Sequence, residues 1–229
     1  MKIDILKRGA FGSALVHLQP GETFISESGA MFRASSNVDI DVTTKSKGKG
    51  GILAGIKRLI GGEHFFFSTY RVTDGSPGEV GLAPTLQGEV RVVDVDPSIS
   101  WLCAGASYMG STDDLAIDTQ FQGFKGMFSG ESLFFLKVSG SGQLLVNAFG
   151  RITELEVDGQ MIVDTGHVVA FEEALDYKVT KAGGSWVSSF VAGEGLVLEF
   201  HGRGKILVQS HNPKEFGKSI GPLLPARQR

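Results

Sequence analysis

The chain of 229 residues has 41% hydrophobic and 21% charged side chains, the composition of a folded globular protein with enough apolar material for a core. Its 22 Lys and Arg residues nearly balance 25 Asp and Glu residues, which excludes a general nucleic-acid partner, so we expect no DNA binding. Cys103 is the single cysteine, which excludes an intrachain disulfide or a thiolate metal cluster and favours a reducing, cytoplasmic location. The 32 glycines and 7 prolines among short apolar runs predict an all-β fold with tight turns.

The chain begins with MKIDILKRGAF, which lacks the apolar core and small-residue cleavage site of a signal peptide, so we expect no export. Further along, glycines and charges interrupt every apolar stretch before it reaches the roughly 18 residues that a membrane-spanning helix needs. The sequence therefore predicts a protein that does not cross a membrane.

Residues 44–61 form a basic and apolar segment in the first third of the chain. Their apolar side chains recur at i, i+1, i+4, i+7 and i+8, which predicts one short amphipathic helix. The candidate contact residues are the basic Lys45, Lys47, Lys49, Lys57 and Arg58 and the apolar Ile52, Leu53, Ile56, Leu59 and Ile60. The favoured interpretation is a lid over an open end of the core, with solvated lysines. The alternative is contact with an anionic membrane surface or an acidic protein partner.

The same segment does not match a phosphate-binding loop. That loop needs G-x-x-x-x-G-K-[ST], whereas residues 50–57 read G-G-I-L-A-G-I-K. An isoleucine stands before the lysine, and Arg58 stands where the hydroxyl that holds magnesium should be. We therefore expect no nucleotide cofactor.

Three Gly-Glu pairs each precede an apolar run, a glycine-bounded turn and a second apolar run. The pairs lie at 62–63, 130–131 and 193–194, and the turns at 74–78, 140–142 and 202–204. This recurrence predicts a β-hairpin used three times. In the last hairpin, a turn at 202–204 would place Phe200 opposite Ile206 and Leu198 opposite Val208.

A second recurring feature, a turn and an apolar strand that reach Gly29, Gly105 or Gly166, lies upstream of each predicted hairpin. Together the two features predict one compact domain over 1–229, built from three internal repeats about a pseudo-threefold axis. The repeats span about 1–84, 85–146 and 147–212, and a C-terminal tail follows at 213–229. The tail has three prolines and no periodicity, so we expect it to lie on the surface or toward a partner subunit.

The middle predicted hairpin is apolar on both faces, with Leu136 and Val138 on one side and Leu133 and Phe135 on the other. One sheet layer cannot cover both faces. We therefore expect burial between neighbouring repeats or in a homo-oligomer, a trimer or a multiple of one.

Three sequence features resemble one conserved bacterial, archaeal and mitochondrial family, named for altered inheritance of mitochondria (member twenty-four in yeast). They are PGETFISESGAMF from residue 20, GGILAGIKRLIGGEHFFFSTYR from residue 50, and the repeated Gly-Glu-apolar pattern. The resemblance covers roughly residues 1–212. It implies three tandem β-sandwich or double-stranded β-helix modules, related in fold to the tryptophan-RNA-binding attenuation protein. The family's biochemical activity is not established, but its mitochondrial members are linked to cristae organisation, which implies a scaffold or interaction role.

Double-stranded β-helix folds often hold metal, which makes the histidines candidate ligands. A cupin-type site would place two histidines one residue apart on a strand, with a glutamate a few positions on. The five histidines are all isolated in sequence: His17, His64, His167, His201 and His211. We expect no metal cofactor.

The remaining candidate groups do not predict catalysis. Cys103 lies in the apolar run ISWLCAG, where a thiol usually acts as a small buried hydrophobe. The acidic pairs 113–114 and 172–173 are adjacent residues, which point to opposite faces of a strand or into solvent. Most phenylalanines lie in runs expected to be buried, so we do not expect RNA binding. The predicted function is a non-enzymatic scaffold or interaction protein; the alternatives are an RNA-binding or small-molecule-binding module, or an enzyme on a β-helix fold.

Overall fold

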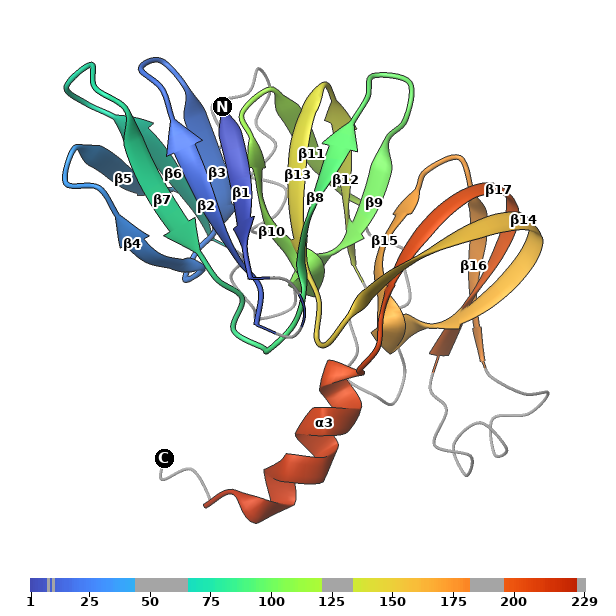
Figure 1. The fold of residues 1–229 in the computed structure, drawn as a ribbon. Helices are drawn as coiled ribbons and strands as arrows, with labels where there is room; N and C mark the ends of the chain where they lie inside the picture. The colour runs from blue at the N-terminus through green and yellow to red at the C-terminus, as the bar shows by residue number, and fades with distance from the viewer. Residues whose placement is uncertain (8, 10, 44–65, 121–133, 182–195, 226–229) are drawn as a thin grey trace.

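The computed structural model describes residues 1–7, 9, 11–43, 66–120, 134–181 and 196–225 (Figure 1). The strands of this part of the chain are β1 (Lys2–Leu6), β2 (Ser13–Leu18), β3 (Thr23–Glu27), β4 (Met31–Ala34), β5 (Val38–Thr43), β6 (Phe67–Val72), β7 (Gly78–Leu82), β8 (Val90–Val95), β9 (Trp101–Ala104), β10 (Tyr108–Thr112), β11 (Leu115–Gln120), β12 (Phe135–Gly140), β13 (Gly142–Asn147), β14 (Ile152–Asp164), β15 (Val168–Glu172), β16 (Asp176–Lys181) and β17 (Leu196–Gln209). The helical elements are the 3-10 turns η1 (Gly105–Ser107), η2 (Thr165–His167) and η3 (Gly221–Leu223) and the α-helix α3 (Pro213–Ile220). The chain is mostly β, as its glycine content predicts.

The described strands form three antiparallel sheets. The four-stranded sheet has the order β1-β2-β7-β4, and the six-stranded sheet has the order β5-β6-β3-β10-β13-β8. The seven-stranded sheet has the order β11-β12-β9-β15-β17-β14, with β16 also paired to β17. In Figure 1 the blue N-terminal strands lie at one end, the green strands in the middle and the orange and red strands at the other end.

The predicted hairpins are wrong, because the two apolar runs of each do not pair with each other. β6 pairs with β3 and β5, whereas β7 pairs with β2 and β4. β12 and β13 likewise belong to different sheets. The first two glycine-bounded links therefore carry the chain from one sheet to another. The link at Gly140 has a φ of 117°, a conformation that glycine adopts without a steric penalty.

The last predicted hairpin is one continuous strand, β17, which passes through residues 202–204 without reversing. Phe200 therefore pairs with Met161 of β14 rather than with Ile206, and Leu198 pairs with Val163. Gly159 and Gly202 face each other in this ladder and have φ values of 110° and 107°. In Figure 1, β14 and β17 curve together. Two glycines at one register position thus let both strands bend while their ladder continues.

The interior consists of three apolar clusters. The first core contains Phe24, Tyr70, Val80 and Leu82, among others, the central core contains Trp101, Cys103, Leu136 and Val138, and the third core contains Phe135, Phe171, Leu198 and Phe200. Strand β12 contributes to two of them, because Leu136 packs in the central core and Phe135 in the third. Both faces of this strand are buried, as predicted. The chain itself provides the cover, so β12 leaves no apolar face for a partner.

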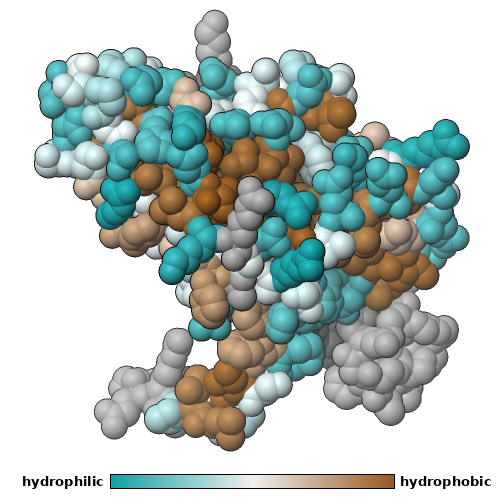
Figure 2. Space-filling model, viewed as in Figure 1, coloured by the Kyte–Doolittle hydropathy of each residue, from teal (hydrophilic) through white to brown (hydrophobic). Residues whose placement is uncertain are grey.

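The C-terminal tail lies on the surface, as expected, but part of it is helical although its sequence shows no periodicity. Residues Pro213–Ile220 form α3, which projects away from the sheets (Figure 1). The Asn212 side chain caps this helix by accepting hydrogen bonds from the backbone N–H groups of Lys214 and Glu215. Figure 2 shows apolar surface along this projection, which includes exposed Phe216, Leu223 and Leu224. The α-helix of the described residues therefore lies in the tail, and the helix predicted in the first repeat lies outside those residues.

Candidate functional site

All ten candidate contact residues of segment 44–61 lie outside the described residues. The structure does describe the strands to which this segment is attached. β5 and β6 are antiparallel neighbours, and their last register position pairs Thr43 with Phe67. Ile40 and Val42 on β5 are 39% and 63% exposed. The segment therefore joins two paired strands at one end of a sheet edge that carries exposed apolar side chains.

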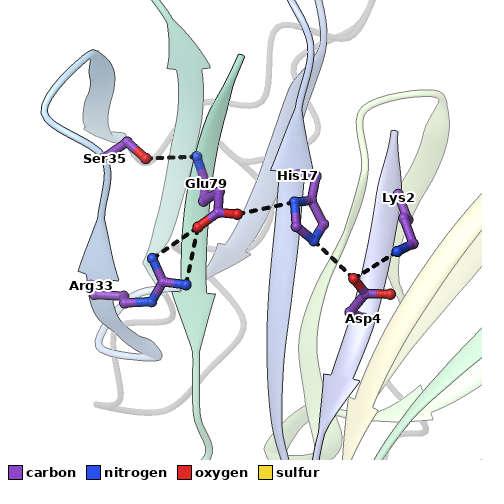
Figure 3. Close-up of polar contacts among 6 residues, drawn as sticks. All are labelled: Lys2, Asp4, His17, Arg33, Ser35 and Glu79. Atoms are coloured by element: carbon purple, nitrogen blue, oxygen red, sulfur yellow. Dashed lines mark hydrogen bonds and ion pairs between the residues drawn. The ribbon is translucent and has the colours of Figure 1, made fainter.

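A network of charged and polar groups crosses the four-stranded sheet (Figure 3). Lys2 Nζ donates to Asp4 Oδ2 at 2.9 Å, His17 Nε2 lies 2.9 Å from the same oxygen, and His17 Nδ1 lies 3.3 Å from Glu79 Oε1. On the other side Arg33 donates from both terminal nitrogens to Glu79 Oε2 at 3.1 Å, and the Glu79 backbone N–H donates to Ser35 Oγ at 3.0 Å. The network thus links all four strands of the sheet.

The network is open to solvent, since the side chains of His17, Glu79 and Arg33 are 28%, 38% and 44% exposed. The hydrogen bond from Lys2 is the largest influence on Asp4 and lowers the pKa of its carboxyl. Each carboxylate of the network lies against a cationic or imidazole group, and exposed pairs of this kind add little stability individually. Its arrangement suits alignment of the strands better than activation of a nucleophile.

The histidines do not converge on a common site in the described part of the chain, which contains no group of three or more His, Cys, Asp or Glu residues able to hold a metal ion. His17 joins the network above, and His167 Nδ1 lies 2.7 Å from the Gln209 carbonyl oxygen. His211 packs against Phe149, with ring centroids 5.1 Å apart. His64 lies outside the described residues.

Two hollows are lined by described residues. The larger, about 390 Å³, is lined by Glu22, Thr112, Asp113, Asp114 and Gln143, among others. The smaller, about 260 Å³, includes Arg91, Trp101, Glu154, Glu172 and Lys205. In the smaller hollow Lys205 Nζ lies 2.9 Å from Glu154, whose other oxygen is 3.8 Å from Arg91. Glu154 therefore lies close to both basic groups of this hollow, while Asp94 and Glu172 add further acidic groups to its lining.

Cys103 is fully buried, as predicted, and burial raises the pKa of its thiol far above the usual range. Burial likewise raises the pKa of Tyr108, whose hydroxyl lies 2.9 Å from Ser111 Oγ. A thiol that stays protonated is a poor nucleophile. The environment of Cys103 therefore agrees with a packing role.

Glu27, at the end of β3, is the carboxyl whose environment is least usual. Burial raises its pKa from 4.5 to about 7. Between these values the folded protein holds a proton that the unfolded chain has released, so stability must fall as pH rises through this window. The side chain is half-buried, and solvent screening reduces the effect, so we expect a loss of about 1–2 kcal/mol.

The variant Glu27→Gln tests this expectation, because glutamine keeps the shape and cannot ionise. We expect it to exceed the parent chain in unfolding free energy by about 1–2 kcal/mol at pH 8 and to match it near pH 4.5. Urea denaturation across this pH range measures the difference, and Asp113→Asn, at an exposed turn, serves as the control. Equal profiles for Glu27→Gln and the parent chain would show that Glu27 titrates normally.

No local sequence pattern predicts the polar network or the burial of Glu27, for the same reason. Both depend on which strands lie side by side, and isolated residues in sequence carry no such signal. The start of helix α3, in contrast, has a local sequence signal, because Asn212, Pro213 and Glu215 form a recognisable N-terminal capping pattern.

The chain is similar to known proteins over nearly its whole length. The family model described as mitochondrial biogenesis AIM24 matches residues 3–211. An uncharacterised protein of Streptococcus pyogenes serotype M6 is 30% identical over 231 residues, which cover 98% of this chain and 92% of that protein. The chain also resembles a Streptococcus pyogenes protein whose crystal structure is known. The two structures have a TM-score of 0.81 and 26% sequence identity, and the match covers 97% of this chain and 99% of that chain. Among the described helices, none has the length and apolar content needed to cross a bilayer.

Proposed function

Because the chain belongs to the AIM24 family of mitochondrial biogenesis proteins, we propose that it is a non-enzymatic scaffold that contacts an anionic membrane surface. The single observation that carries this proposal is segment 44–61. It combines five basic and five apolar candidate residues and joins the paired strands β5 and β6. Basic amphipathic segments bind anionic lipid through apolar burial together with electrostatic attraction.

The scaffold in this proposal is a threefold repeat of one β-sandwich-like unit, spanning about 1–84, 85–146 and 147–212. Its support is that one pairing scheme recurs: β4 pairs with β7, β10 with β13, and β15 with β17, each with a register shift. The shifts lie between Met31 and Arg33, between Tyr108 and Gly110, and between Val168 and Ala170. In the same way β5 pairs with β6, β11 with β12, and β16 with β17. The pseudo-threefold axis remains a prediction.

The non-enzymatic part of the proposal is supported by the chemistry of the described residues. The buried thiol of Cys103 stays protonated, and the carboxylates around His17 already face cationic partners. A catalytic site would need a titratable group aimed into a concavity by a second polar group. In the smaller hollow described above, the amine of Lys205 is already paired with Glu154.

Vesicle sedimentation tests the membrane contact. The intact chain should bind vesicles that contain phosphatidylserine and should release them at high salt. A variant with Lys45, Lys47, Lys49, Lys57 and Arg58 replaced by glutamine should bind roughly 100-fold or more weakly, because each basic side chain contributes on the order of 1 kcal/mol near an anionic surface. The matched control removes five exposed charges elsewhere, by glutamine replacement of Lys2, Lys178, Arg203, Lys205 and Lys218.

The control variant should retain most of the binding. An equal loss in both variants would show that net charge, rather than segment 44–61, drives adsorption. Absence of vesicle binding by the intact chain at low salt would contradict the membrane proposal and favour the lid interpretation of this segment.

A further inference from the structure

Two open strand edges lie at opposite ends of the molecule. Inside the chain, β3 pairs with β10 and β9 pairs with β15, and these ladders join successive repeat units. Among the described strands, β4 pairs with β7 alone, and the second half of β14 pairs with β17 alone. Figure 1 places β4 far from this half of β14. Each edge is therefore free to accept another strand.

One residue at each register shift shows which contact is missing at the open edge of β4. The shift skips Phe32 in β4, Met109 in β10 and Val169 in β15, so these three residues are equivalent. Met109 is 1% exposed and packs in the first core, and Val169 is 0% exposed and packs in the central core. Each therefore inserts into the core of the preceding unit. Phe32 has no preceding unit, and it is 54% exposed.

At the open edge of β14, a residue that is buried in the equivalent strands is exposed. Ile25 of β3 lies opposite Ser111, and Leu102 of β9 lies opposite Phe171, in the two internal ladders. In the third unit, the register of β14 against β17 shows that Ile162 is the residue equivalent to Ile25 and Leu102. Ile25 and Leu102 are 7% and 1% exposed, whereas Ile162 is 60% exposed. The third unit thus carries the receiving half of the contact, and among the described strands none pairs with it there.

We propose that copies of this chain join head to tail, with β4 of one copy paired antiparallel to the second half of β14 of the next. The register of the internal ladders places Ala34 opposite Ile162 and Arg33 opposite Val163. Phe32 then enters the third core of the neighbouring copy, beside partly buried Met161. The occupant is a second copy because this chain already forms the same contact twice with its own strands.

A head-to-tail contact uses a different surface on each copy, so it continues until a ring closes or a filament forms. This inference rests on the repeat of strand pairing, and it does not depend on the membrane contact of segment 44–61. The two ideas can therefore fail separately.

Analytical ultracentrifugation of the intact chain and two charged variants tests the contact. The intact chain should sediment as a concentration-dependent assembly larger than a monomer. Phe32→Glu destroys one end and Ile162→Glu destroys the other, so each variant alone should be a monomer, with association weakened at least about 100-fold because a charge would be buried. An equimolar mixture should form a one-to-one dimer, since each variant keeps the end that the other lacks.

Ile40→Glu changes an exposed apolar residue on β5, a strand of the six-stranded sheet that belongs to neither of the two edges, and should assemble like the intact chain. The milder changes Phe32→Ser and Ile162→Thr repeat the experiment if a charged variant fails to fold by circular dichroism. A monomeric intact chain at every soluble concentration would overturn the proposal. It would equally be overturned if Phe32→Glu alone stayed assembled, or Ile162→Glu alone did, because the contact would then be symmetric.

Discussion

Gly88→Ala should destabilise the fold by roughly 3–5 kcal/mol, through backbone overlap and lost hydrogen bonds. A Cβ atom at Gly88 would lie 1.6 Å from the backbone oxygen of Ala148, which cannot turn away as a side chain can. Gly88 also accepts a hydrogen bond from the Gly12 N–H at 2.8 Å and forms a bridge with Gly150. Gly12, Gly88 and Gly150 thus bring three distant chain segments together, so displacement of the backbone at Gly88 disturbs its contacts with the other two.

Urea denaturation measures this loss as a lower midpoint with an unchanged slope. Gly217→Ala is the matched control, because a Cβ atom added at Gly217 would have no other atom within 4 Å, and alanine favours a helix interior by about 0.5–1 kcal/mol. The control should therefore be neutral or slightly stabilising. A loss below about 1 kcal/mol for Gly88→Ala would contradict the close approach of the two backbones.

Phe171→Ala should cost about 3–5 kcal/mol, the usual range for removing a fully buried phenylalanine. Its ring lies at the centre of the third core, with centroids 5.1 Å from Phe135, 4.9 Å from Tyr177 and 4.9 Å from Phe200. All three contacts are edge-to-face, a favourable geometry for aromatic pairs. Truncation removes these contacts and leaves a cavity among strands β12, β15, β16 and β17.

Thermal or urea unfolding measures the cost, and Phe11→Ala provides the control because this phenylalanine is 71% exposed. The control should change stability by no more than about 0.5 kcal/mol. Similar small effects for both variants would show that the third core is loosely packed.

Local sequence patterns predicted the strands well but not their partners. The apolar run, glycine turn and second apolar run look the same whether the chain reverses within one sheet or crosses to another. At Gly140 the chain crosses from one sheet to another. At Gly202 the strand β17 only bends, because Gly159 of the paired strand β14 lies opposite and bends with it. The local pattern alone does not distinguish these outcomes, because they depend on strands far away in the sequence.

In the candidate site too, local sequence patterns predicted only the features that do not depend on strand partners. Burial of Cys103 could be read from its apolar neighbours, whereas the contact of His17 with both Asp4 and Glu79 requires three strands in register. The burial of Glu27 also depends on the packing of distant strands. Long-range register is fixed by the whole set of core contacts, so these features follow from the fold rather than from nearby residues.

Disulfide trapping tests most directly the central claim, that one repeated junction organises this chain and joins its copies. Residues opposite each other in an antiparallel ladder have Cα atoms about 4.5–5.5 Å apart, which a disulfide can span. Under mild oxidation, an equimolar mixture of Ala34→Cys and Ile162→Cys chains should form a covalent heterodimer, while each variant alone and the parent chain with buried Cys103 should not. Homodimers of either variant at the same rate as the heterodimer, or no crosslinking in the mixture, would contradict the claim.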